Sequence, residues 1–87
     1  MFINKAKNGR NNICGEKIAV LRKQRNLSQR KLADLMQVNG LDIDKNAVQR
    51  IEAGKRFITD IELIEFSKVF CVDINELFIN FIPSSIP

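Results

Sequence analysis

One short segment of the chain carries four long or amide side chains with the spacing of a single helical face. Drawn on an α-helix at about 100° per residue, they fall within an arc of about 140°: Lys45, Asn46, Gln49 and Arg50. Lys and Arg can donate to guanine O6 and N7, and Asn and Gln can pair with adenine through two hydrogen bonds. The opposite side of the same helix would be apolar, with Ala47, Val48 and Ile51. The pattern is compatible with contact with base edges, and a solvated polar helix face fits it equally well.

Helix start and stop signals frame this segment and the one before it. Asp44 is an N-cap residue ahead of Lys45, and Gly54 is a left-handed stop after about eight helical residues. Ser28 caps a preceding helix that ends at Asn39-Gly40 and has an apolar stripe of Leu32, Ala33, Leu35 and Met36. Two short helices joined by a turn can place the second one in the major groove of DNA.

Three further helices are expected around this pair. Asn12 can cap a first helix that ends near Arg25 and has Cys14, Ile18 and Leu21 on one side. Thr59-Asp60-Ile61-Glu62 has the form of a capping box, and Asp73-Ile74-Asn75-Glu76 repeats it at the start of a fifth helix. No segment alternates with period two. The expected fold is therefore all-α, a compact five-helix bundle around one core.

The 87 residues are enough for one domain. Residues 1–11 are polar and aperiodic, which predicts a flexible basic arm. Residues 12–82 hold all the helical patterns and form the predicted domain. Two prolines and two serines in residues 83–87 predict a non-helical C-terminal tail.

Basic residues are concentrated in the first half of the chain. Residues 1–37 hold nine Lys and Arg against two Asp and Glu, whereas residues 38–87 hold five against eight. A basic half suggests a polyanionic partner such as nucleic acid or an anionic membrane. A membrane-surface protein would need a long basic amphipathic helix, which the sequence lacks. A solvated basic face fits the charge alone as well as nucleic acid does.

Several classes of function lack the residues they require. The chain has no His, so neither a Ser-His-Asp nor a Cys-His catalytic pair can form. Its two cysteines lie 57 positions apart, which is not a zinc-binding spacing. We expect no enzymatic activity, metal, cofactor or small-molecule substrate. The amino terminus lacks an apolar signal segment and no run is long enough to span a bilayer, so the expected location is the cytoplasm.

Several blocks at fixed offsets resemble the phage-repressor and Cro family of helix-turn-helix domains, also called XRE-like regulators. They are Leu27-Ser28-Gln29 followed by Leu32-Ala33, then Ile51-Glu52-Ala53-Gly54-Lys55-Arg56, then Glu76-Leu77-Phe78. The resemblance covers about residues 13–79. It implies a lambda-repressor-like domain of five helices that regulates transcription, as a repressor, by binding double-stranded DNA. It also implies a homodimer on a near-palindromic operator, and no catalysis.

The resemblance also suggests a role for individual residues. It places the four polar residues of the third helix, Lys45, Asn46, Gln49 and Arg50, at base-contacting positions. The phosphate-contacting candidates are Gln29, Arg30, Lys55 and Arg56. Arg22 and Glu52 match a structural ion pair between the first and third helices.

Three features depart from the family pattern, the smallest of which is Ser67 at a position where the family usually has alanine. The separation between Ala33 and Glu52 is nineteen residues, longer than usual, which predicts a longer second helix and a longer turn over residues 37–43. The resemblance then does not determine the angle between the second and third helices. Cys71 stands where the family usually has a left-handed glycine, at a cost of about 1 kcal/mol or with a shifted turn.

A second class of function is compatible with the same sequence. The apolar tail Phe78-Ile79-Asn80-Phe81-Ile82 can form a dimer interface or bind another protein, as in an antitoxin-like interaction module. Packing against the core is the third explanation for these residues. The sequence leaves the choice among them open.

Overall fold

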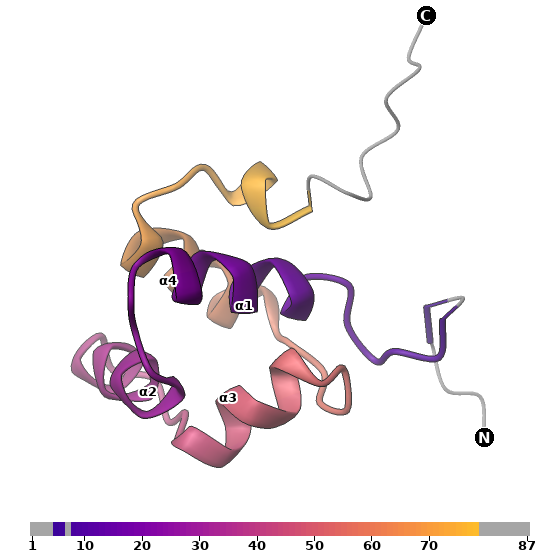
Figure 1. The fold of residues 1–87 in the computed structure, drawn as a ribbon, viewed down its shortest axis with the longest axis horizontal. Helices are drawn as coiled ribbons and strands as arrows, with labels where there is room; N and C mark the ends of the chain where they lie inside the picture. The colour runs from indigo at the N-terminus through magenta and orange to yellow at the C-terminus, as the bar shows by residue number, and fades with distance from the viewer. Residues whose placement is uncertain (1–4, 7, 79–87) are drawn as a thin grey trace, which may run out of the picture.

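The computed structural model describes residues 5, 6 and 8–78, which form four α-helices and one short 3₁₀ helix around a single core (Figure 1). The helices are α1 (Gly15–Gln24), α2 (Gln29–Val38), α3 (Lys45–Glu52), α4 (Asp60–Phe70) and the 3₁₀ helix η1 (Ile74–Phe78). The described part of the chain contains no strand. The all-α prediction is confirmed. The predicted count of five helices is not confirmed, because the described part of the fifth element is a 3₁₀ helix.

Three helices begin at the N-caps expected from the sequence. The Ser28 hydroxyl accepts a hydrogen bond from the Lys31 amide at 3.0 Å, and the Asp44 carboxylate accepts one from the Ala47 amide at 2.7 Å. At α4, Thr59 and Glu62 form the complete reciprocal capping box. These caps satisfy amides that would otherwise lack partners in the first turn.

The start of α1 differs from the expectation. The residue before its first turn is Cys14, which makes no side-chain cap, and the Asn12 side chain accepts instead from the Gly15 amide at 2.8 Å. A Cβ at position 15 would clash with the Ile51 carbonyl oxygen. Glycine therefore allows α1 to approach the end of α3 closely.

The predicted second capping box near the C-terminus does not form. Asp73 accepts from the Asn75 amide, two residues ahead, at 3.0 Å, while the Glu76 amide donates to the Asp73 backbone carbonyl at 2.9 Å. This geometry is a tight turn that leads into η1 rather than an α-helical start. Leu77 of η1 is buried, and Phe78, the first residue of the apolar tail, packs against the core; the rest of the tail, residues 79–82, lies outside the described residues.

All four α-helices end in the same hydrogen-bonding pattern. After each helix, a left-handed residue and the residue that follows it donate to two carbonyls of the last turn, as in a Schellman motif. The left-handed residues are Asn26, Gly40, Gly54 and Cys71. Cys71 therefore adopts the left-handed conformation for which a glycine was expected at this position, with φ of 55°.

The longer connection between α2 and α3 is anchored in the core. It spans residues 39–44, and Ile43 within it is fully buried. The Gln37 side chain donates to the Ile43 carbonyl at 2.9 Å, so this buried backbone oxygen has a partner. The extra residues thus form an ordered turn that sets the position of α3 against α2.

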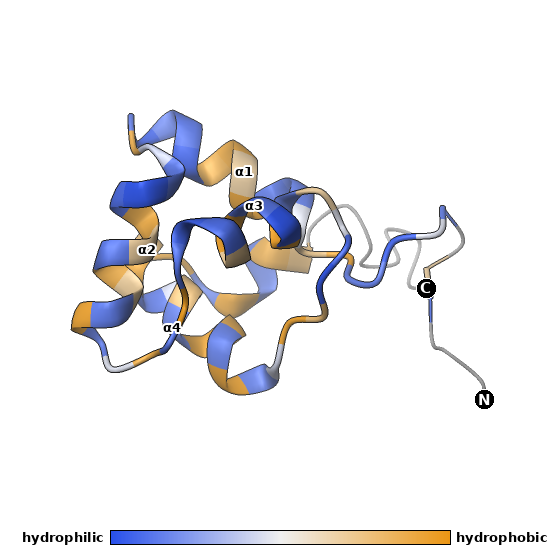
Figure 2. Cartoon of the chain, turned by 90° about the horizontal axis from the view of Figure 1, so that it is seen from below, coloured by the Kyte–Doolittle hydropathy of each residue, from blue (hydrophilic) through white to orange (hydrophobic). Residues whose placement is uncertain are grey.

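The core lies where the apolar stripes of the helices converge. Phe66 and Phe70 of α4 are fully buried and stack with ring centroids 6.4 Å apart. α2 and α3 pack together on one side of the core, and α1 and α4 lie on the other (Figure 1). The outer side of α3 is largely hydrophilic (Figure 2), so only its inner stripe is used for packing.

Cys71→Gly is expected to stabilise the protein by about 0.5–1 kcal/mol, because glycine adopts a positive φ without the steric cost of a Cβ. Urea unfolding would measure the change. Cys71→Ser, which keeps the Cβ, should leave the midpoint nearly unchanged. A glycine variant that is less stable than the parent would contradict this account of the turn.

Candidate nucleic-acid interface

The two faces of α3 have opposite surroundings. Ala47, Val48 and Ile51 are buried in the core, which holds the helix in place. The four polar residues expected to contact bases are all exposed: Lys45, Asn46, Gln49 and Arg50. The helix therefore presents a continuous set of hydrogen-bond donors and acceptors on a rigid support.

A polar groove runs between the start of α3 and the exposed side of α2. It has a volume of about 390 Å³, and its wall brings Arg30 of α2 together with Lys45 and Asn46 of α3. Asp34 and the N-cap Asp44 also line it. Residues assigned separately to phosphates and bases thus share one continuous surface.

Glu52, the last residue of α3, joins three helices through its carboxylate. Arg22 of α1 donates to both carboxylate oxygens, from Nε to Oε2 at 2.7 Å and from Nη2 to Oε1 at 3.1 Å. Gln29 of α2 donates to Oε1 at 3.0 Å. The Arg22 and Glu52 side chains are only 12% and 10% exposed. The same arginine donates to the Leu27 carbonyl at 2.8 Å, so it also holds the turn between α1 and α2.

The network gives Gln29 a defined position at the start of α2. One of its amide hydrogens is used by Glu52, while the backbone amide of Gln29 lies in the first turn, where helical amides have no partner within the helix. Such a helix end attracts anions. Gln29 is therefore held where a phosphate could reach both its backbone and its side chain.

The N-terminal segment, residues 10–12, donates hydrogen bonds to backbone carbonyls at and just after the C-terminal end of α3. The Arg10 guanidinium donates to the carbonyls of Ile51 and Glu52, at 3.4 and 2.9 Å, and Asn12 donates to the Ile51 and Arg56 carbonyls at 3.0 and 2.7 Å. The Asn11 amide donates to the Gly54 carbonyl at 2.7 Å. A positive group at this end of a helix also interacts favourably with the helix dipole.

These contacts of Arg10 and Asn11 were not predicted from the sequence, which indicated a flexible arm over residues 1–11. The partners are about 40 residues apart along the chain, and no local periodicity connects them. Asn12 was predicted to cap the first helix, but its contacts with the end of α3 were not predicted. Residues 1–4 and 7 of the predicted arm lie outside the described residues.

Arg56, expected to contact phosphate, forms an intramolecular ion pair. Its Nη1 and Nη2 atoms each lie 3.0 Å from a carboxylate oxygen of Glu62. Burial opposes ionisation of Glu62, but hydrogen bonds from Arg56 and Thr59 outweigh it and hold the pKa of this carboxyl below its usual range. The hydrogen bond to Glu62 likewise raises the pKa of Arg56. The pair fixes the connection between α3 and α4.

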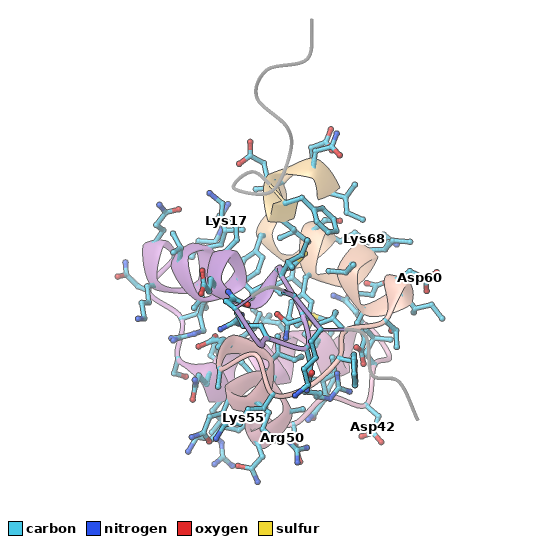
Figure 3. All side chains as sticks on the ribbon, turned by 90° about the vertical axis from the view of Figure 1, so that its right-hand side faces the viewer. Lys17, Asp42, Arg50, Lys55, Asp60 and Lys68 are labelled. Atoms are coloured by element: carbon cyan, nitrogen blue, oxygen red, sulfur yellow. The ribbon has the colours of Figure 1, made fainter. Side chains whose placement is uncertain are left out.

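Lys55 and Arg50 extend the positive surface at the end of α3. Both are exposed, and their side chains project from the same end of the molecule in Figure 3, away from Lys17 and Lys68. The Lys55 carbonyl accepts from the Asn11 side chain at 3.0 Å, which fixes the backbone at this position.

The described residues also bear on metal binding, membrane insertion and thiol chemistry. They contain no cluster of three potential metal ligands, and none of their helices is long and apolar enough to cross a membrane. Burial raises the pKa of the Cys14 thiol to about 11, so this group stays protonated at neutral pH. Cys71 is a free, exposed thiol.

Comparison with known proteins matches residues 18–77 to a family model described as helix-turn-helix. The match runs from Ile18 in α1 to Leu77 in η1 and excludes the segment with Arg10 and Asn12. No significant match was found among curated proteins or among solved structures.

Glu52→Ala is expected to lower the free energy of unfolding by about 3 kcal/mol, because it leaves the nearly buried Arg22 without its counter-charge. Chemical denaturation would measure the loss. Glu16→Ala is a suitable control, since Glu16 is 58% exposed and lies 3.7 Å from its arginine partner. If Glu52→Ala unfolds at the same denaturant concentration as the parent, the ion pair contributes nothing to stability.

Glu62→Gln should make stability less dependent on pH in the acid range. The folded protein holds the pKa of Glu62 below that of the unfolded chain, about 4.3. The ionised pair therefore stabilises the fold above this pH and loses its effect as the pH falls through the lower, folded value. We expect the parent to exceed the variant by about 1 kcal/mol near pH 6, with the difference shrinking toward pH 3.

Thermal unfolding across this pH range would follow the difference. Glu65→Gln serves as the control because Glu65 pairs only with the exposed Lys68, at 3.4 Å. A constant difference between parent and Glu62→Gln at all pH values would contradict the assignment.

Proposed function

We propose a repressor function on one premise: the chain belongs to the helix-turn-helix family of the Cro and phage-repressor type, the XRE-like regulators. This family binds DNA and regulates transcription. The observation that carries the proposal for this chain is the division of α3 into a buried stripe and an exposed polar arc, on a helix held at both ends. A helix supported in this way can be inserted into the major groove as a rigid element.

In this proposal, the exposed arc of α3 contacts base edges. Asp44 caps the N-terminal end of the helix, and Lys45 and Asn46 lie in its first turn beside the polar groove. Residues at this end of a recognition helix enter the groove first. Lys45 and Asn46 then make the most direct base contacts, and Gln49 and Arg50 extend them along the helix.

Phosphate contacts flank the bases on both sides. Gln29 and Arg30 lie at the start of α2, where free backbone amides and a positive side chain favour an anion. Lys55 follows the end of α3. Arg56 contributes positive charge at this end while it stays bound to Glu62. Such contacts set orientation and affinity without selecting a sequence.

The operator in this proposal is a near-palindrome bound by a homodimer. A two-fold symmetric dimer presents its two α3 helices to half-sites related by the same symmetry. Repression follows if the occupied operator overlaps a promoter, because the bound dimer then excludes the polymerase.

The alternative, an antitoxin-like or other protein-interaction module, depended on the apolar C-terminal residues. Phe78 packs against the core, and Ile79, Phe81 and Ile82 lie outside the described residues. No contact of the described chain favours this alternative over DNA binding.

Two substitutions separate base contact from phosphate contact. Asn46→Ala should relax preference at one position in each half-site, at about 1–3 kcal/mol for the base pair concerned, because it removes a two-point hydrogen-bond contact. Gln29→Ala should weaken binding about equally for all sequences. Selection of bound duplexes from a random pool, followed by titration of the best sequences, would measure both.

Gln24→Ala provides the control, since Gln24 is exposed on α1 and has no assigned role. If Asn46→Ala leaves the selected motif unchanged at every position, α3 does not contact bases as proposed. Failure of the parent to select any duplex would remove the DNA-binding proposal itself.

A further inference from the structure

The outer side of α4 carries apolar residues that the core does not cover. Ile61 and Ile64 are 62% and 46% exposed, and Phe57, two residues before the N-cap of the helix, is also exposed. At about 100° per residue, Ile61 and Ile64 lie on the side of α4 opposite Phe66 and Phe70. Half of the large exposed apolar side chains among the described residues thus fall between positions 57 and 64.

Two opposite charges lie at the ends of this stripe. Asp60 is the first residue of α4, Lys68 lies in its last turn, and Ile64 is four residues from each. On the helix these three residues span an arc of about 80°, and Figure 3 shows the labelled Asp60 and Lys68 on the same side of the molecule. Lys68 is 66% exposed and makes only a 3.4 Å contact with Glu65. We call Asp60, Ile61, Ile64 and Lys68 the α4 stripe.

The α4 stripe is complementary to itself when reversed. It runs from an acidic residue through an apolar centre to a basic residue. If two copies of α4 pack antiparallel with Ile64 on the two-fold axis, each Asp60 faces the Lys68 of the other copy, and the isoleucines meet in the middle. An interface in which the same patch serves both molecules must have this property.

We infer that the α4 stripe is a docking surface for a second copy of this chain, packed antiparallel about an axis at Ile64. The biological use of this contact rests on the proposed function, because it supplies the dimer that a near-palindromic operator requires. The contact leaves the DNA-facing side chains free: Arg50 and Lys55 project from a different part of the molecule than Asp60 and Lys68 (Figure 3).

Self-complementarity is what favours a second copy over a different protein. A foreign partner could use the exposed isoleucines, but it would not require opposite charges at equal distances on both sides of Ile64. The patch is small and its charges are exposed to water, so the expected dimer is weak without DNA.

The first experiment disrupts the centre of the stripe. Ile64→Lys would set two positive charges against each other across the axis, and we expect the dissociation constant of the dimer to rise about tenfold or more. Val20→Lys is the matched control: Val20 is 45% exposed on α1, and Glu16 precedes it by four residues as Asp60 precedes Ile64. Sedimentation of the full chain over a concentration series would measure both variants.

The second experiment tests the antiparallel register. Asp60→Lys alone and Lys68→Asp alone each place like charges opposite one another at both ends of the interface, so each should weaken the dimer. The double variant Asp60→Lys/Lys68→Asp restores opposite charges and should recover dimerisation to near the parent level. Thermal unfolding at low concentration measures any loss of monomer stability separately from the loss of dimerisation. Losses of monomer stability would add up in the double variant, whereas dimerisation should be restored in it.

Three outcomes would overturn the inference: a parent that stays monomeric up to about 1 mM, an Ile64→Lys variant that dimerises like Val20→Lys, or a double variant that is weaker than both single variants. Binding to a duplex with one half-site keeps this test separate from the proposed function. Ile64→Lys should bind that duplex as the parent does. Normal dimerisation without DNA binding would remove only the proposed function.

Discussion

The position of α3 depends on the charged contacts made at its C-terminal end. The Glu52 carboxylate receives Arg22 from α1 and Gln29 from α2, while the backbone carbonyls of the same turn receive Arg10. Because Arg22 and Glu52 are nearly buried, neither charge can be satisfied by water if the other moves away. The helix that bears the candidate base contacts is therefore tied at one point to two other helices and to the N-terminal segment.

The same arrangement connects the candidate phosphate contacts to the candidate base contacts. Gln29 is held by Glu52, the residue that ends α3, and Arg30 shares a groove with Lys45 and Asn46. A change in the position of α3 would therefore also move the Gln29 side chain at the start of α2. The candidate interface is thus one preorganised unit, and preorganisation lowers the entropy that a surface loses when it binds a partner.

The basic residues of this protein fall into two groups, one engaged in contacts within the chain and one exposed to solvent. Arg10, Arg22 and Arg56 are each engaged with backbone carbonyls or carboxylates of the chain itself. Lys45, Arg50 and Lys55 are exposed instead. The guanidinium group suits the contacts within the chain because its planar set of donors can satisfy two acceptors at once. Net charge alone does not reveal this division: Arg56, at a candidate phosphate-contacting position, is paired with Glu62 within the chain.

The sequence by itself determined the elements whose signals are local. Ser28, Asp44 and Thr59 form caps with amides three residues ahead, and the apolar stripe of α3 repeats within one helix, so short-range pattern was sufficient. Only the tertiary structure decided the rest. Arg10 meets carbonyls about 40 residues away, Ile43 fixes the long turn by entering the core, and the segment after Asp73 becomes a 3₁₀ helix rather than an α-helix. Each of these outcomes depends on which distant surfaces come together, and that information is absent from the spacing of residues along the chain.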